Sequence, residues 1–217
     1  MRMFNPEWQA IKDFETVSDV HDLQFDLSAG EIPEDHGWHL SQALCALAPW
    51  LADTPGAGIH PVHAAPTGRN DNLIVNRRVK LVLRLPKARL PDASLLSGHD
   101  IDPGAGRLTL GQMKDKPLTP YATLYAHFVD HGIADEGEFL AAARRELEEM
   151  AIPAGLICGK RRKIATPDGL AEGYSLMLHD LRLEHSLLIQ ERGLGRNRLY
   201  GAGIFIPHKS IKEVAIE

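Results

Sequence analysis

Four histidines lie close together in the first third of the chain, and imidazole is the side chain best suited to proton transfer near neutral pH. They form two pairs with the same spacing, His36 with His39 and His60 with His63. Because the unperturbed pKa of histidine is about 6.5, a neutral imidazole can accept a proton while an imidazolium donates one. Two such groups at one site would suffice for general acid–base catalysis. A surface or hydrogen-bonded structural role fits a single histidine equally well, so the pattern alone leaves both interpretations open.

The same spacing raises the alternative of a metal site, since carboxylates are also plentiful in the first 35 residues. However, the chain has no His-Glu-x-x-His motif, and the segment His60-Pro-Val-His63 looks extended. Residues i and i+3 of an extended segment point to opposite faces, which is a poor arrangement for shared coordination. We therefore expect no metal and no cofactor. Activity that survives a chelator would dismiss the metal enzyme.

A glycine-rich segment near the C-terminus is the most distinctive local motif. It contains four glycines and two arginines, namely Gly193, Gly195, Arg196, Arg198, Gly201 and Gly203. Glycine lets the backbone approach a bulky ligand, and backbone N–H groups in such a loop can point at phosphate oxygens. The arginines would add charge-assisted contacts. The segment is no P-loop, because no Gly-Lys-Ser/Thr follows, and local composition fits tight backbone packing as well as ligand binding.

Basic residues are clustered although the net charge of the chain is −5. The net charges of residues 1–66, 67–116, 117–155 and 156–217 are −8, +5, −5 and +3, so acidic and basic blocks alternate with a period of about half the chain. The basic blocks include Arg77 and Arg78, and the run Lys160, Arg161, Arg162 and Lys163. Local patches decide whether a polyanion docks, so a nucleic acid is a candidate partner. A solvated surface with chance clustering is the alternative.

The elements that must position these residues follow one order twice. In the first half, periodicity predicts strands at 20–27, 72–76, 80–85 and 107–113, an extended piece near 59–64, a helix at 37–51 and a short helix within 86–97. In the second half it predicts a strand at 121–129, a helix at 136–150, a hairpin from 155–158 and 171–178, a helix at 183–192 and a strand at 203–206. Both halves follow the β-α-β-β-α-β order. We expect an α+β protein of two tandem ferredoxin-like domains, residues 1–116 and 117–217.

Composition agrees with an ordinary globular protein. Apolar residues make up 44% and charged residues 24% of the 217 residues, and only two cysteines are present. These counts exclude a disulfide framework and a cysteine-rich zinc site. The sequence shows no apolar signal core and no apolar stretch that could span a bilayer. We therefore expect a cytoplasmic protein without a membrane partner.

Several of these segments resemble one known family. The spacing of the four glycines matches the C-terminal glycine-rich loop of the RAMP superfamily of CRISPR-associated proteins. Further likeness lies in residues 35–44, 58–62, 80–86 and 186–207. Together they look like the sixth Cas family in its myxobacterial (MYXAN) subtype, the endoribonuclease that matures CRISPR RNA. The resemblance covers roughly residues 20–207, and it supports the tandem ferredoxin-like fold.

The resemblance implies a reaction and a partner. The family cuts the repeat RNA of the CRISPR precursor without a metal, by attack of a 2′-hydroxyl that leaves a 2′,3′-cyclic phosphate. Its catalytic histidine generally lies on or just after the first helix, a region that holds all four histidines. His36 and His60 are favoured over His39 and His63, because the segments around them, His36-Gly-Trp and Gly58-Ile-His-Pro, carry the resemblance. The basic clusters and the glycine-rich loop would bind the stem-loop of the repeat, and other CRISPR effector subunits are further candidate partners. The alternative is an RNA-binding subunit of the same superfamily that cleaves nothing.

Overall fold

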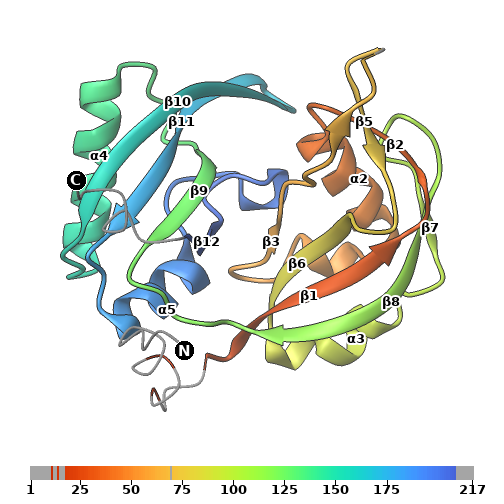
Figure 1. The fold of residues 1–217 in the computed structure, drawn as a ribbon, viewed down its shortest axis with the longest axis horizontal. Helices are drawn as coiled ribbons and strands as arrows, with labels where there is room; N and C mark the ends of the chain where they lie inside the picture. Colours follow the sequence, from red (N-terminus) through yellow and green to blue (C-terminus); the bar gives the residue numbers. More distant parts are fainter. Residues whose placement is uncertain (1–10, 12–13, 15–17, 69, 209–217) are drawn as a thin grey trace, which may run out of the picture.

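The computed structural model describes residues 11, 14, 18–68 and 70–208, in which each half of the chain builds its own antiparallel sheet (Figure 1). The N-terminal sheet has the order β3 (Gly58–Ile59), β6 (Lys80–Pro86), β1 (Val20–Leu27), β8 (Leu108–Pro117), β7 (Asp100–Ile101). Every second residue of β1 is buried, including Leu23, Phe25 and Leu27, as period-2 alternation requires. This sheet and its helices enclose the first hydrophobic core.

The N-terminal helices differ in length from the predicted ones. Helix α2 (Gly37–Leu47) buries Leu40 and Leu44 and ends before Pro49, which begins the 3₁₀ turn η1 (Pro49–Leu51). Proline has no N–H to continue the helical hydrogen bonds, so the predicted helix at 37–51 is divided there. The turn η2 (Lys87–Arg89) and the five-residue helix α3 (Leu90–Ser94) occupy the place of the second helix.

The C-terminal sheet has the order β10 (Gly155–Thr166), β11 (Gly169–His179), β9 (Leu124–Val129), β12 (Phe205–Pro207). Helix α4 (Glu136–Glu149) begins at Asp135, whose carboxylate accepts the N–H of Glu138 at 2.9 Å. Helix α5 (Leu183–Arg192) ends at Gly193, and the turn η3 (Arg198–Tyr200) lies between it and β12. A second hydrophobic core fills this unit.

Both sheets have the strand order of a ferredoxin-like fold. In each half, the first and third strands of the β-α-β-β-α-β order lie at the centre, with the second and fourth strands outside them. These strands are β3, β6, β1 and β8 in the N-terminal sheet and β10, β11, β9 and β12 in the C-terminal sheet. The predicted α+β class with two tandem ferredoxin-like units is confirmed.

Three details depart from the predicted elements. A small sheet of β2 (Gly30–Pro33), β5 (Asn72–Val75) and β4 (Ala65–Pro66) is added to the N-terminal unit. Strand β8 continues to Pro117, four residues beyond the predicted strand at 107–113 and across the predicted domain boundary. The β10–β11 hairpin is longer than predicted and reaches over toward α2 and β5 (Figure 1). The exact domain division between residues 116 and 117 stays a prediction.

None of the helices in the described part of the chain is long and apolar enough to cross a membrane.

Candidate active site

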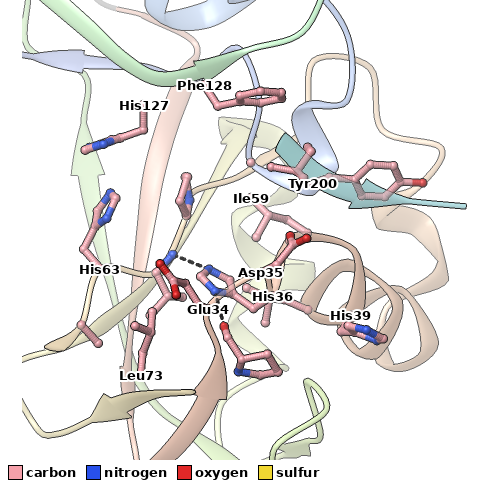
Figure 2. Close-up of a pocket in the computed structure, with 18 of the residues that line it drawn as sticks. Glu34, Asp35, His36, His39, Ile59, His63, Leu73, His127, Phe128 and Tyr200 are labelled. Carbon is pink, nitrogen blue, oxygen red and sulfur yellow. Dashed lines mark hydrogen bonds between the residues drawn. The ribbon is translucent and has the colours of Figure 1, made fainter. Parts of the chain in front are cut away.

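A cavity of about 910 Å³ lies between the two units, and segments distant in the sequence form its walls. They are the chain before α2 and its start, the chain from Ile59 to Ala64, residues 70–73, strand β9, the basic stretch of β10 and the loop at Tyr200 and Gly201. Figure 2 shows His63 and His127 together on one side of this cavity, with His36 between them and the helix that carries His39. The cavity therefore joins residues of both ferredoxin-like units.

A second, smaller cavity of about 230 Å³ adjoins the first. The two share the four lining residues His60, Pro61, His63 and His127. Arg78 and Lys80 line the smaller cavity, and Arg162 and Lys163 line the larger one. We call these two adjoining cavities the interdomain groove; the shared histidines lie where the cavities meet, and each cavity has basic side chains.

His63 and His127 are in ring-to-ring contact across the two units. His63 follows β3 in the N-terminal unit, and His127 lies on β9 in the C-terminal unit. Their ring centroids are 4.0 Å apart and the rings are tilted by 44°. On the same face of β9, the ring of Tyr125 contacts His127 edge-on, with ring centroids 4.8 Å apart.

The surroundings of this pair favour neutral imidazoles in the free protein. Burial, the neighbouring His63 and Arg162, and then His208 and His60, lower the pKa of His127 to about 4. Burial, His36 and Arg162 likewise lower the pKa of His63 below its ordinary value. Positive charges around each ring disfavour a further proton. A bound phosphate would reverse this balance, because it would add a negative charge beside both rings.

His36 has structural partners at both ring nitrogens. Its side chain is 5% exposed, Nε2 accepts the N–H of Val62 at 2.9 Å, and Nδ1 therefore carries the proton and donates it to Pro33 O at 2.9 Å (Figure 2). Burial lowers the pKa of His36. A histidine in this state has no free nitrogen for a proton on RNA. The predicted catalytic role of His36 stays a prediction, and this arrangement does not support it.

His60 belongs to a buried ionic network. Its Nε2 lies 3.1 Å from Asp22 Oδ1, and Asp22 also accepts two hydrogen bonds from Arg84, at 2.7 and 2.8 Å. Burial by itself would raise the pKa of Asp22, but the charges of His60 and Arg84 and their hydrogen bonds lower it well below its usual range. For His60, burial outweighs Asp22 and lowers the pKa. Its predicted catalytic role is likewise untested, and its observed contact is with Asp22.

The glycine-rich loop packs its backbone tightly. The N–H groups of the four glycines donate within the chain, to Ile189 O, Glu146 Oε2, Arg198 O and Phe128 O. The expected backbone contacts to phosphate therefore have no free donor at Gly193, Gly195, Gly201 and Gly203 in this conformation. Fully buried Asp130 holds the loop by accepting from the Arg196 guanidinium and from Asn197 Nδ2, at 3.1 and 2.7 Å. RNA binding by this loop remains a prediction.

The two arginines of the loop have different environments. Arg196 keeps 65% of its side chain exposed while it pairs with Asp130, so it remains accessible to a ligand. Arg198 donates to Gly203 O at 3.4 Å and to Gly56 O at 3.3 Å, and so links the loop to the N-terminal unit. Burial, with the nearby charge of Arg84, lowers the pKa of Arg198 to about 10. Its visible role is to hold the two units together.

The basic residues of the β10–β11 hairpin stand over the larger cavity. Arg161 and Lys163 pair with Glu172 of the facing strand, while Arg162 lines the cavity beside the two histidines. The Ala165 N–H donates to Asp35 Oδ2 at 2.7 Å, which fixes the end of the hairpin to the N-terminal unit. Lys160 is exposed at the other end of the basic run.

Arg77 and Arg78 lie in the exposed turn between β5 and β6. The N–H of Arg78 donates to Asn76 Oδ1 at 2.9 Å, and its side chain lines the smaller cavity. The structure therefore brings Arg78 and Arg162 to the two adjoining cavities of one groove. Arg77 is not among the residues that line it.

Sequence reasoning missed His127 and set His63 aside. The alternation of the strand at 121–129 places Tyr125 and His127 on one face, which was the available sign of a groove-facing histidine. The contact with His63 depends on how the units pack, and no local pattern encodes that.

The structure gives no support for the metal-site alternative. Within residues 18–68 and 70–208, no group of three or more His, Cys, Asp or Glu side chains is placed to hold an ion.

Comparisons with known proteins agree with the resemblance seen in the sequence. The family model described as Cas6 Crispr matches residues 21–210. The CRISPR-associated endonuclease Cas6 of Myxococcus xanthus (strain DK1622) is 33% identical over 187 residues, which cover 86% of this chain and 80% of that protein.

Solved structures of low sequence identity share the fold. A CRISPR associated protein Cas6 superposes with a TM-score of 0.61 at 11% identity, covering 88% of this chain and 100% of that chain. A Cas6-related protein from Pyrococcus furiosus gives 0.59 at 12%, covering 86% and 98%. A RAMP protein described as binding different RNA substrates gives 0.59 at 10%, covering 85% and 98%. The family model spans most of the chain and the curated relative exceeds 30% identity, so this chain belongs to the Cas6 family of CRISPR-associated proteins.

Proposed function

We propose that this protein is an endoribonuclease that cuts CRISPR repeat RNA without a metal ion. The observation that carries the proposal is the interdomain groove, in which histidines of both units meet between basic side chains. Family membership and the endonuclease name of the Myxococcus relative support the same activity. The RNA substrates named for a RAMP protein of the same fold are consistent with RNA as the partner.

The groove offers the groups that 2′-hydroxyl attack requires. The attacking hydroxyl must lose a proton, the 5′ oxygen that leaves must gain one, and the pentacoordinate phosphorus carries extra negative charge. Histidine side chains serve the two proton transfers, and an arginine beside them stabilises the charge. The products would be a 2′,3′-cyclic phosphate and a free 5′-hydroxyl. The N-terminal unit would supply most of the histidines and the C-terminal unit the basic hairpin.

Phosphate contacts would hold the stem-loop in register. The candidate contacts are the groove arginines Arg78 and Arg162, with Arg77, Lys160, Arg161, Lys163 and Arg196 as exposed basic residues around them. An A-form stem hides its base edges in a deep groove, so such a protein recognises mainly shape and backbone. Binding through these residues would weaken as the salt concentration rises.

The test is cleavage of the repeat RNA from the CRISPR locus of the same genome, in EDTA, beside a copy that is 2′-deoxy at the cut site. A single cut in the normal RNA and none in the deoxy copy is the expected result. Tight binding without cleavage would contradict the enzyme and leave an RNA-binding subunit. Cleavage of the deoxy copy would contradict 2′-hydroxyl attack, and loss of activity in EDTA would contradict independence from metal.

A further inference from the structure

His63 and His127 differ from the other histidines of the interdomain groove in their contacts. His36 bonds to backbone groups with both nitrogens, and His60 bonds to Asp22. His39 is exposed on α2, where its ring lies 5.1 Å from that of Trp38, and Figure 2 shows it away from His63 and His127. Of these five histidines, His63 and His127 are the two whose rings meet in the groove.

We propose that His63 and His127 form the acid–base pair of the RNA cleavage, with Arg162 stabilising the charge on the phosphate. This inference rests on the proposed function. Both histidines line both cavities, so they occupy the point where the larger and the smaller cavity join. A strand whose phosphates contact both Arg162 and Arg78 would pass this point, and the proposal places the scissile phosphate there.

The two members have different exposures, which assigns their roles. His127 lies on a central strand of its sheet and is half-buried, whereas His63 lies in an exposed segment after β3. The imidazolium form loses less hydration at the more exposed position. His127 is therefore the base and His63 the acid. The low pKa of His127 supports this order, because the ring is neutral at neutral pH and ready to accept a proton.

The proposed step balances as follows. Neutral His127 takes the proton of the 2′-hydroxyl, and the 2′ oxygen forms a bond to phosphorus. The bond between phosphorus and the 5′ oxygen breaks, and protonated His63 gives its proton to that oxygen. The products are the cyclic phosphate, the 5′-hydroxyl, protonated His127 and neutral His63. Proton exchange with water then restores both side chains, so no oxidant, reductant or other reactant is needed.

The test uses single-turnover cleavage by the full chain and its variants H63A and H127A, with H99A as the matched control. General acid–base groups contribute about 10²- to 10⁴-fold, so each of the first two variants is expected to lose cleavage within that range. RNA affinity and melting temperature should stay close to wild type. H99A should cleave normally, because His99 is exposed and lines neither cavity of the groove.

A second substrate separates proton donation from a structural role. It carries sulfur in place of the 5′ oxygen at the cut site, and a thiolate leaves without being protonated. H63A should cleave this RNA at nearly the wild-type rate, while H127A should stay slow. The sulfur-substituted RNA would overturn the assignment of acid and base if it restored cleavage in both variants, in neither variant, or in H127A alone.

Failure of the pair and failure of the proposed function give different results. If wild type cuts the normal RNA and both alanine variants cut it equally fast, the pair is wrong and the endonuclease stands. If wild type does not cut, the proposed function itself is wrong and the pair fails with it. The variants H63N and H127N, which keep a polar planar side chain, must show the same loss and rescue as the alanine variants. Wild-type rates in them would also overturn the pair.

Discussion

At the scale of single residues, one side-chain type serves several purposes because its surroundings differ. His36 is held by backbone groups, His60 by a carboxylate, and His63 and His127 by each other. The sequence alone does not distinguish these four environments, because the contacts arise from the packing of both units. The sequence therefore pointed to the histidines between His36 and His63 as candidates, whereas His127, the second member of the proposed pair, lies in the other half of the chain.

The structural role of His36 predicts a loss of stability in H36A. The change leaves the buried Val62 N–H without an acceptor and Pro33 O without this donor. A buried group left without its hydrogen-bond partner costs about 1–3 kcal/mol. Denaturant unfolding should show this decrease, with the cleavage rate of the folded fraction close to wild type. An unchanged unfolding free energy with abolished cleavage would instead restore His36 as the catalytic histidine.

The charges around the proposed pair predict an acidic pH profile for kcat/KM, which reports the free enzyme. Cleavage needs neutral His127 and protonated His63, so the rate should rise with pH near the His127 pKa of about 4. It should fall as His63 loses its proton below its ordinary value of about 6.5, because the pKa of His63 is lowered. Bound phosphate raises both pKa values, so the profile of kcat should lie at higher pH than that of kcat/KM.

Arg162 supplies the control for this pH profile. Its charge lowers the pKa of both His63 and His127, so R162M should move both limbs of the kcat/KM profile to higher pH. Profiles of wild type and R162M that coincide, or a wild-type alkaline limb at or above a pH of about 6.5, would contradict the assignment of the two rings. Other groups facing the pair, His36, His60 and His208, are unchanged in this variant.

At the scale of elements, periodicity predicts most of the fold. The helix at 136–149 and the strand at 20–27 match closely because each has one continuous apolar face. The small sheet of β2, β5 and β4 was not predicted as a sheet, since its strands are two to four residues long. Strands this short hold too few residues to show a clear period-2 pattern. The length of the hairpin likewise depends on Asp35, far away in the sequence.

The glycine-rich loop illustrates how one motif fits two interpretations. Its glycine spacing identified the family, while its backbone contacts are internal. A Cβ at Gly203 would lie 2.2 Å from Leu194 O, and the residue has φ +65°. No L side chain fits there without movement of the backbone. The glycines are thus needed for packing, whatever the loop side chains contact.

This packing predicts that G203A is much less stable than G56A. Both positions have positive φ, +65° and +73°, but no atom lies within 4 Å of a Cβ at Gly56. The conformational cost alone is about 1–2 kcal/mol and applies to both variants. The collision with Leu194 O adds to it only in G203A. Denaturant unfolding of the two variants measures the difference, and equal losses of stability would show that the loop relaxes without cost.

At the scale of the whole molecule, the two units are joined by one buried arginine as well as by the groove. Arg84 is fully buried on β6, and its Nη1 donates to Gln190 O at 3.0 Å and Phe205 O at 2.7 Å in the C-terminal unit. The rest of its guanidinium pairs with Asp22. This junction keeps His63 and His127 in contact, because the rings belong to different units. Two domains were predicted from the sequence, but a charged group in the middle of their interface was not.

Removing Arg84 should therefore separate the unfolding of the two units. R84M leaves Asp22 buried without its main partner and two carbonyls without a donor, and loss of one member of a buried ion pair costs about 3–5 kcal/mol. In a W8F background, Trp38 and Trp50 report on the N-terminal unit by fluorescence, while far-ultraviolet circular dichroism reports on both units. Wild type should give coincident denaturation curves and R84M two separate ones. The double variant D22N/R84M should recover part of the lost stability, because it no longer buries an unpaired charge. Coincident curves and an unchanged midpoint in R84M would mean that other contacts between the units, such as that of Arg198 with Gly56 O, are enough to join them, so the histidine pair would not depend on Arg84.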